Sequence, residues 1–287
     1  MDTTTPGEQT ERAAAESSTD WAAAERERLA DHYARHHAAP EVLEYWHRRR
    51  RFYYTALQRL FQLHVPPGSR VLDVGCGTGD LLASLKPACG VGIDPAADVV
   101  EYARTKHPHL TFLAAEPESF EVDGTFDYAV LCNEIGTFAD VQRVLDRIRR
   151  VTTTDSRVLI AYYNALWEPA LRAASALGLR RKVAEQNWLS RWDLENLLSL
   201  AGFEVIRESA ELLCPLGIPP LAGLCNRFLV RLPLLRHLGL VTFLVAKPAG
   251  PPPGAEHFSC SVVIPTRNER GNIAAAVART PALGTHT

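Results

Sequence analysis

The chain has 287 residues, 46% of them hydrophobic, with a formal net charge of −2 and a pI of about 6.6. This length is sufficient for one complete hydrophobic core, and the slightly acidic balance argues against a nucleic-acid partner, because proteins that bind nucleic acid usually carry a basic surface. We expect a cytoplasmic protein without a metal site, since the sequence shows no signal-like segment, no apolar run of the ~18 residues that span a membrane, and six scattered cysteines without metal-ligand spacing.

Residues 1–66 precede the first predicted strand. Residues 1–19 are polar and are expected to be disordered, and residues 20–66 are expected to form two helices. In the second, residues 41–64, apolar side chains recur with a helical period. It contains four consecutive arginines, Arg48–Arg51, which would point to all sides of a helix. We therefore expect a mostly solvated stretch there, although a single arginine could contact a phosphate-bearing acceptor.

The most informative segment is Val71–Gly79, which reads VLDVGCGTG. A short apolar strand runs into three glycines at alternate positions, Gly75, Gly77 and Gly79, and a helix-compatible run follows. Glycine allows a sharp turn and lets a ligand lie against bare backbone, near the amides that begin the next helix. Fifteen positions after Gly79, Asp94 ends a second strand, where a carboxylate can accept hydrogen bonds from ribose hydroxyls. The combination predicts a nucleoside cofactor.

The glycine turn does not fit a dinucleotide. The dinucleotide fingerprint has glycine at the sixth position of the turn, and here that position is Asp80, whose charge would repel a pyrophosphate. A second carboxylate, Asp73, lies inside the strand. Both residues favour a cationic or amine-bearing ligand over a phosphate.

With DVGCGTG followed by GIDP, the chain resembles the class I S-adenosylmethionine-dependent methyltransferases. The resemblance implies an α/β, Rossmann-like fold with a seven-stranded, mostly parallel sheet flanked by helices. It implies a cofactor domain over residues 67–247, capped by the helices of residues 20–66, with S-adenosyl-L-methionine as the cofactor. The residues that it assigns to cofactor binding are Asp73, Gly75, Gly77, Gly79, Asp94, Pro95, Glu116 and Asn133.

Two of these assignments come from later strands. Residues 110–120 resemble the third strand and following loop of the family, which makes Glu116 the adenine contact, although the family more often has Asp after Gly. Residues 128–132 resemble the fourth strand, whose end lines the pocket between cofactor and acceptor. This places Asn133 near the methionine part of the cofactor, and it makes Glu134 a candidate base on the acceptor side.

The fifth strand is expected at residues 157–163, after a helix at residues 140–150 and a turn at residues 152–156. The methyl group of the cofactor is already activated, so the enzyme must chiefly position it, and an oxygen acceptor must also lose its proton. Our catalytic candidates are Glu134 and Tyr162. Other plausible pocket residues are His47, Tyr53, Tyr54, Tyr163 and Asn164.

The remaining part of the domain is predicted as a helix at residues 167–184, a helix that begins at Ser190 with Asp193 completing a capping box, and two closing strands at residues 202–206 and 241–246. Between these strands, residues 212–240 are apolar with interspersed cations. This pattern suits a helix on a membrane surface, a lid over a hydrophobic acceptor, or a buried helical pair.

The C-terminal part has a different character. Residues 248–257 form a stiff linker rich in proline and glycine, and Phe258–Ile273 reads FSCSVVIPTRNERGNI, which resembles the opening of family 2 glycosyltransferases. No metal-binding Asp-x-Asp motif follows, and residues 258–287 are far fewer than a domain of that kind needs. We expect this truncated segment to be unable to transfer sugar, and it either is disordered or packs on the first domain.

The sequence therefore predicts an S-adenosylmethionine-dependent methyltransferase that acts on a small-molecule, glycan or lipid-linked acceptor. One alternative is a non-catalytic cofactor-binding module partnered with, or fused to, a family 2 glycosyltransferase. Another use of the nucleoside, such as aminopropyl transfer, also stays open. Peripheral membrane contact through residues 212–240 is one further option.

Overall fold

The computed structural model describes residues 24–181, 183–184, 186–215, 221–229, 232 and 238–250. The chain divides into two units, Met1–Pro248 and Ala249–Thr287, and the first contains the elements described below. The predictions for residues 1–19, for most of the linker and for the glycosyltransferase-like segment 258–287 fall outside the described residues.

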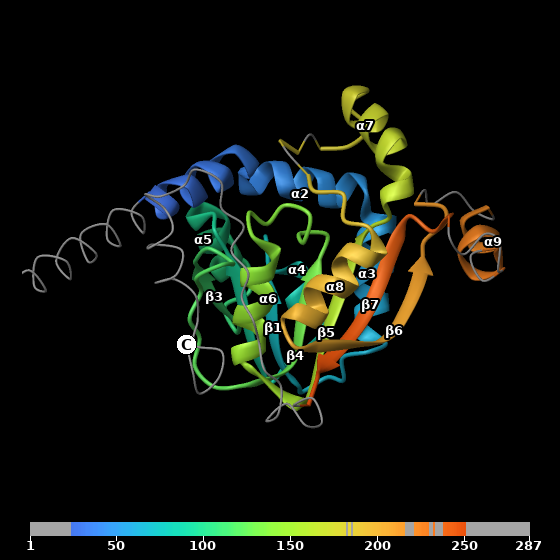
Figure 1. Ribbon diagram of the computed structural model, residues 1–287. Helices are drawn as coiled ribbons and strands as arrows, with labels where there is room; N and C mark the ends of the chain where they lie inside the picture. The colour runs from blue at the N-terminus through green and yellow to red at the C-terminus, as the bar shows by residue number, and fades with distance from the viewer. Residues whose placement is uncertain are drawn as a thin grey trace, which may run out of the picture. The chain divides into compact units, whose positions relative to one another are not determined.

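A seven-stranded sheet forms the centre of the first unit, in the order β3-β2-β1-β4-β5-β7-β6 (Figure 1). The first five strands pair in parallel, whereas β7 is antiparallel to both of its neighbours. This confirms the predicted seven-stranded, mostly parallel sheet and its two closing strands. The strands are β1 (Arg70–Val74), β2 (Cys89–Asp94), β3 (Thr111–Ala114), β4 (Phe126–Cys132), β5 (Thr152–Tyr163), β6 (Phe203–Glu211) and β7 (Val241–Pro248).

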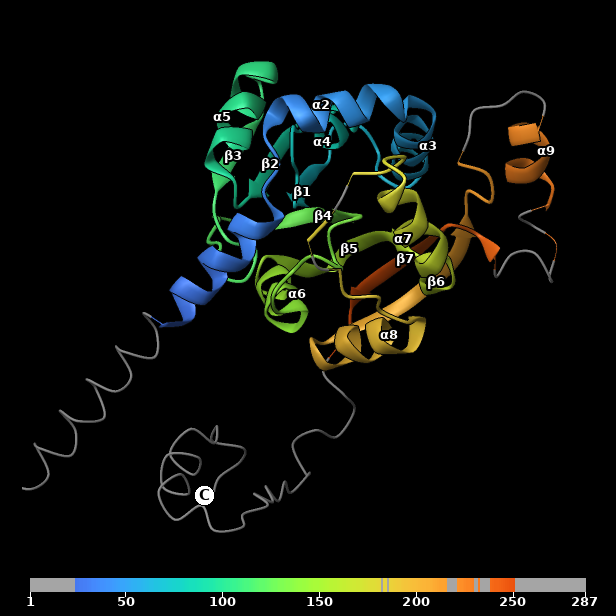
Figure 2. The ribbon, with the colours of Figure 1, turned by 90° about the horizontal axis from the view of Figure 1, so that it is seen from above.

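Helices cover both faces of the sheet, as the view from above shows (Figure 2). One face packs against apolar residues of α3, α4 and α5, and the opposite face packs against α6 and α8. Because both faces are buried, the central strands are apolar almost throughout. The helices are α2 (Pro40–Arg49), α3 (Arg51–Gln62), α4 (Asp80–Ser84), α5 (Ala97–Lys106), α6 (Val141–Arg150), α7 (Glu168–Ala176), α8 (Arg191–Leu200) and α9 (Leu221–Arg227), with a further helical stretch at residues 24–36 and a 3-10 turn at Ala165–Trp167.

The single helix predicted over residues 41–64 is wrong. The structure has two helices, α2 and α3, separated at Arg50, whose backbone is non-helical with φ −113° and ψ 31°. The break lets α2 lie across the carboxyl ends of the central strands (Figure 1), while α3 buries Leu57 and Phe61 on one face of the sheet. The Phe61 ring contacts Phe243 of β7 with ring centroids 5.3 Å apart. The four-arginine run therefore straddles a turn, and its side chains are not spread around one helix.

Two further segments differ from the predictions. The expected turn at residues 152–156 is part of β5, where the pairing with β4 shifts register and Ser156 Oγ donates a 2.6 Å hydrogen bond to the Phe126 carbonyl. The helix expected over residues 167–184 ends at Ala176, because the chain turns at Gly178 with φ +69°. The capping box of Ser190 and Asp193 at the start of α8 is confirmed.

Of the segment 212–240, the structure describes α9 and short flanking stretches. The Asn226 side chain accepts from the backbone amide of Cys214 and donates to its carbonyl, at 2.7 and 2.8 Å. Leu224 and Phe228 are 52% and 61% exposed, which does not fit a buried helical pair at these two positions. Among the described residues, no helix combines the length and the apolar character needed to cross a bilayer.

Candidate functional site

A cavity of about 560 Å³ lies at the carboxyl ends of β1, β2 and β4. The strand order reverses between β1 and β4, and ligands of open α/β sheets bind at such a switch point. Residues of the 24–36 helix, of α2 and α3, and of the segment before α8 complete the walls. Six of the predicted cofactor residues line this cavity: Asp73, Gly75, Gly77, Asp94, Pro95 and Asn133.

Asp73 is the most unusual of these residues. Its side chain is 1% exposed, and neither carboxylate oxygen has a hydrogen-bond partner among the described residues. Burial, with the nearby charges of Asp94 and Glu134, raises the pKa of Asp73 to about 8. A buried carboxyl group without partners is costly, so its presence in a cavity wall fits a ligand that brings a cationic donor. The amine-bearing ligand predicted from the sequence meets this requirement.

The three glycines of the turn all have positive φ, at +80°, +51° and +79°, but they serve different purposes. A Cβ on Gly75 would lie 2.7 Å from Glu134 Cγ, and a Cβ on Gly79 would lie 2.6 Å from the Phe112 ring. A Cβ on Gly77 would meet no atom within 4 Å. Gly77 therefore leaves its backbone open to a ligand, whereas Gly79, which does not line the cavity, is required by packing against β3.

Asp94 connects the glycine turn to the end of β2. Its carboxylate accepts hydrogen bonds from the backbone amides of Gly77 and Ala96, each at 3.0 Å. Burial raises the pKa of Asp94 to about 6, and the charge of Glu134 adds to the effect while the two amides oppose it. A carboxylate oxygen can accept more than one hydrogen bond, so Asp94 retains capacity for hydroxyl donors in the cavity.

Glu116 does not line the cavity, although the next residue, Pro117, does. The Glu116 carboxylate accepts a 3.4 Å hydrogen bond from Ser119, and its adenine contact stays a prediction. Glu118, two positions on, is 3% exposed and accepts from the Tyr33 hydroxyl at 2.7 Å and the Ala139 amide at 3.0 Å. It fixes the 24–36 helix against the cavity wall, a role that the sequence pattern did not reveal.

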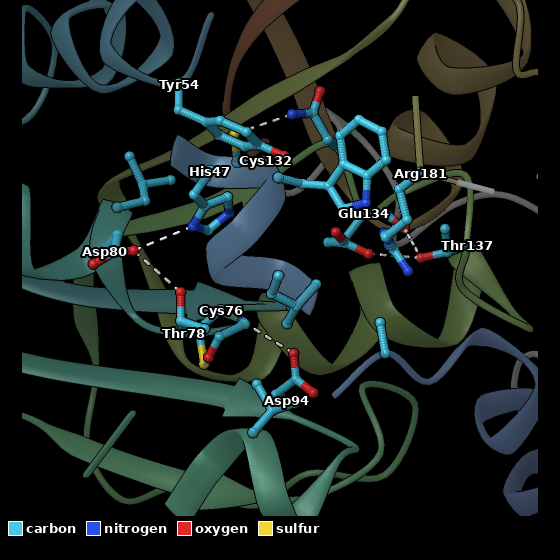
Figure 3. A pocket seen from close by; sticks show the side chains of 18 of the residues that line it. His47, Tyr54, Cys76, Thr78, Asp80, Asp94, Cys132, Glu134, Thr137 and Arg181 are labelled. Atoms are coloured by element: carbon cyan, nitrogen blue, oxygen red, sulfur yellow. Dashed lines mark hydrogen bonds and ion pairs between the residues drawn. The ribbon is translucent and has the colours of Figure 1, made fainter. Parts of the chain in front are cut away.

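The end of β4 brings Asn133 and Glu134 into the cavity, as predicted. Asn133 has φ +65°, a conformation that asparagine tolerates better than most residues, and its Oδ1 accepts from the Tyr53 hydroxyl at 2.9 Å. Glu134 Oε2 accepts from Thr137 Oγ1 at 3.0 Å (Figure 3). The Glu134 side chain lies over Gly75.

Tyr162 does not join the other candidates. It is 5% exposed and packs in the core beneath α6 and α8, where burial raises its pKa to about 12. Successive strand residues point to opposite faces, so its neighbour Tyr163 lines the cavity instead. Of the other pocket candidates, His47 and Tyr54 line the cavity. Tyr53 is buried behind Asn133, and the Asn164 amide donates to the Gly239 carbonyl.

Asp80 organises one wall of the cavity. Lys106 Nζ lies 2.7 Å from its Oδ1, His47 Nδ1 lies 3.2 Å from its Oδ2, and Thr78 Oγ1 donates to it at 3.1 Å. Burial alone would raise the pKa of Asp80, but the hydrogen bonds and charge of His47 and Lys106 hold it below its usual value. Figure 3 shows the contacts of Asp80 with His47 and Thr78. With Lys106, they join α2, α4 and the end of α5.

A possible metal-binding group overlaps this wall. Glu44, His47 and Asp80 bring ligand atoms within 4.8 Å of one another. The Lys106 ammonium already contacts both carboxylates, which accounts for the cluster as an ion-pair network without requiring a metal.

The half of the cavity away from Asp94 is aromatic and basic. It includes Trp46, Tyr54 and Tyr163, and the arginines that line the cavity are Arg48, Arg50, Arg51, Arg180 and Arg181. Figure 3 shows Arg181 and Tyr54 on the side of the view away from Asp94. The sequence suggested the two tyrosines, but it did not reveal that arginines from two distant segments meet here.

Comparison with known proteins gives a consistent picture. A family model described as a methyltransferase domain matches residues 45–208, more than half of the chain. An O-methyltransferase of Penicillium expansum is 31% identical over 150 residues, which cover 48% of this chain and 53% of that protein. A ubiquinone/menaquinone biosynthesis C-methyltransferase of Campylobacter jejuni is 24% identical over 115 residues, covering 37% and 49%. The chain thus spans about half the length of these curated relatives.

Among solved structures, a SAM-dependent methyltransferase of Thermotoga maritima, described as a possible histamine N-methyltransferase, superposes with a TM-score of 0.55. It is 17% identical, and the match covers 71% of this chain and 93% of that one, so the likeness concerns the fold. The fold, the buried Asp73 carboxylate without a hydrogen-bond partner among the described residues, and the family match all indicate a methyltransferase. The chain belongs to the methyltransferase domain family, has the fold of the class I S-adenosylmethionine-dependent methyltransferases, and its cofactor is S-adenosylmethionine.

Proposed function

We propose that this protein transfers the methyl group of S-adenosylmethionine to a small-molecule acceptor, with glycans and lipid-linked molecules among the candidates. The observation that carries the proposal is the unpartnered, buried carboxyl group of Asp73 in the wall of a cavity. Beside it are the open backbone of Gly77 and the carboxylate of Asp94. A cofactor with a cationic amine and ribose hydroxyls matches these three features.

Three residues of the cavity have separate proposed roles toward the cofactor. Asp73 accepts hydrogen bonds from the amino group, Asp94 accepts them from ribose hydroxyls, and Gly77 leaves room for close backbone approach. S-adenosylmethionine supplies a sulfonium-activated methyl group when bound. The protein contributes orientation, which accounts for much of the acceleration in reactions of this kind.

Glu134 is the proposed general base for a hydroxyl acceptor. It lies over the glycine turn and faces the cavity, and the Thr137 hydroxyl holds one of its oxygens at 3.0 Å. A base must come within hydrogen-bond reach of the proton that it removes, and Glu134 lies between the cofactor residues and the aromatic wall. Tyr162 has no part in this proposal, because its side chain lies on the other side of the sheet.

The test begins with calorimetric titration of the purified chain with S-adenosylmethionine and its demethylated product. We expect Asp94→Ala to lose roughly 1.5–3 kcal/mol of binding free energy, because a charge-assisted acceptor is removed. Unchanged affinity in this variant would contradict the ribose assignment. Methyl-labelled cofactor incubated with fractionated cell extract then identifies the acceptor class. Binding without label transfer into any fraction would favour the non-catalytic cofactor-binding module.

Two further parts of the proposal concern a partner protein and contact with a membrane. The resemblance of residues 258–273 to a family 2 glycosyltransferase supports a glycan-modifying partner and a sugar- or lipid-linked acceptor. The exposed Leu224 and Phe228 of the 212–240 segment support peripheral membrane contact. Co-sedimentation with anionic liposomes tests that contact, and absence of binding would remove it.

A further inference from the structure

The carboxylates and the arginines of the cavity come from different segments of the chain. The carboxyl groups of Asp73, Asp94 and Glu134 gather at the glycine turn and the ends of the central strands. The five arginines come instead from the break between α2 and α3 and from residues 180–181, after α7. The carboxylates suit the cofactor, but the cofactor residues do not explain the arginines.

The two arginine segments are held together although they lie far apart in the sequence. The Arg50 guanidinium donates a hydrogen bond to the Leu179 carbonyl, directly before Arg180. Arg50 is the residue at the break between α2 and α3, so the break is part of this arrangement. It places Arg50, Arg180 and Arg181 on one stretch of cavity wall.

These three arginines are partly buried, yet none has a counterion within 4 Å among the carboxylates that the structure describes. By contrast, the neighbouring Arg172 and Arg191 lie outside the cavity and pair with Glu168 and Glu195. A guanidinium that is partly removed from water favours an anionic partner.

Arg180 is also held in a fixed orientation. Its guanidinium carbon lies 4.8 Å from the centroid of the Tyr163 ring, and it donates a 2.9 Å hydrogen bond to Gln186 Oε1. A guanidinium has five donors in a planar fork, so most of them are left for a ligand. Trp46, whose ring centroid lies 6.0 Å from the Arg50 guanidinium, and Tyr54 extend the aromatic wall beside it.

We infer that the acceptor carries an anionic oxygen group, a carboxylate or phosphate, which Arg180 and Arg181 bind while the aromatic side chains contact its apolar body. Arg50 is a positioning residue that fixes the segment before Arg180. The inference rests on the proposed methyl transfer and adds the chemical class of its acceptor. It gives the arginine run a function that a solvated helix face would not have.

Matched small probes test this inference on the full chain. Phenyl phosphate and benzoate represent the anionic group, and benzyl alcohol and benzamide are their neutral counterparts. Binding is measured by calorimetry or ligand-observed NMR, with and without saturating S-adenosylhomocysteine. We expect the anionic probes to bind at least ~10-fold more tightly than the neutral ones and to weaken as salt rises. Arg180→Gln and Arg181→Gln should each weaken anion binding about 10-fold, and Arg172→Gln should leave it unchanged.

Equal binding of anionic and neutral probes would overturn the inference, as would unchanged anion binding in both arginine variants. If Arg180→Gln and Arg181→Gln weaken S-adenosylhomocysteine as strongly as the probes, the arginines bind the cofactor carboxylate and the acceptor assignment fails. Thermal melts show whether the variants fold, and Arg180→Lys, which keeps the charge but removes the planar fork, is the substitute if they do not. Failure of the wild-type chain to bind S-adenosylhomocysteine would contradict the proposed function, whereas the titrations without it still decide on the anion site.

Discussion

Individual residues of the glycine turn illustrate how one residue type can meet separate requirements. All three glycines adopt positive φ, which disfavours any side chain. Beyond that shared constraint, Gly75 makes room for Glu134, Gly79 makes room for Phe112, and Gly77 faces open space. The sequence pattern predicted a ligand-facing role for all three, and packing separates them.

The comparison of Gly77→Ala with Gly79→Ala tests this separation. Both variants incur the cost of positive φ, roughly 1–2 kcal/mol. Gly79→Ala also forces a contact of 2.6 Å with Phe112, so we expect its Tm to fall several degrees further than that of Gly77→Ala. Gly77→Ala should lose more cofactor affinity, since its methyl group projects into the cavity. Thermal melts and calorimetry measure the two effects, and equal losses of Tm would contradict the packing role of Gly79.

Glu134 allows a second prediction at this scale. Glu134→Gln preserves the shape of the side chain and the oxygen that accepts from Thr137, but it removes the base. On a hydroxyl acceptor identified by label transfer, we expect kcat to fall by about 10²–10⁴, the usual contribution of a general base. Cofactor affinity by calorimetry should change little. Glu121→Gln, at a carboxylate that is 88% exposed outside the cavity, serves as the control. A kcat equal to that of the control would exclude Glu134 as the base.

At the scale of elements, strands were more predictable than helix ends. Apolar runs that end in glycine or in polar residues identify the central strands in the sequence. Each strand predicted within residues 67–247 is present. The break at Arg50 carries no glycine or proline signal, so only the tertiary packing of α2 and α3 reveals it. In β5, alternation sends Tyr162 into the core and Tyr163 into the cavity, a difference of one residue that depends on which face each neighbour covers.

Asp80 supports a prediction about how the elements are joined. Asp80→Asn removes the carboxylate charge that contacts Lys106 and His47. The partly buried Lys106 ammonium then keeps Glu44 as its one carboxylate partner among the described residues. We expect unfolding free energy to fall by roughly 1–3 kcal/mol and cofactor affinity to weaken, because α2 is no longer tied to the start of α4. Since the pKa of Asp80 is lowered in the folded protein, its contribution is present above the unfolded pKa near 4 and is lost as the pH falls further.

The matched control for Asp80 is Asp98→Asn. Asp98 also accepts from a histidine of the N-terminal region, with His37 Nε2, just after the 24–36 helix, at 2.9 Å, but the Asp98 side chain is 50% exposed. Exposed pairs of this kind contribute little, so its melting temperature at pH 7 should match the wild type. An equally small effect in Asp80→Asn, measured by denaturant unfolding, would show that the network does not hold α2.

For the whole molecule, the sequence indicated the sheet, the cofactor and the carboxylates around it, because local patterns encode them. The aromatic and basic part of the cavity was only partly predictable. The sequence suggested His47, Tyr54 and Tyr163, but only the folded chain brings the arginines of residues 48–51 and 180–181 together. The same assembly determines the pH behaviour, since Asp73, Asp94 and Glu134 come from the ends of three strands. Burial raises the pKa of Asp73, and the charges of Asp94 and Glu134 add to the effect. Burial also raises the pKa of Asp94, and the charge of Glu134 again adds to it.

This coupling predicts that cofactor binding and global stability depend on pH together. In the ligand-free protein the pKa of Asp73 is raised to about 8, so between pH 4 and 8 the folded state holds a proton that the unfolded state has lost, and stability falls as pH rises through this window. A bound ammonium group favours ionised Asp73, so S-adenosylhomocysteine binding should release a proton and tighten from pH 6 to pH 7.5. A ligand at 100 times its Kd adds about 2.7 kcal/mol of stability, so at a fixed concentration the rise in Tm should be larger at pH 7.5.

Asp73→Asn should raise the ligand-free Tm at pH 8 and lose most of the ligand-induced rise. Calorimetry in buffers of different ionisation enthalpy counts the released proton, and a ligand-induced rise in Tm that is equal at both pH values would show that Asp73 does not receive the cationic group.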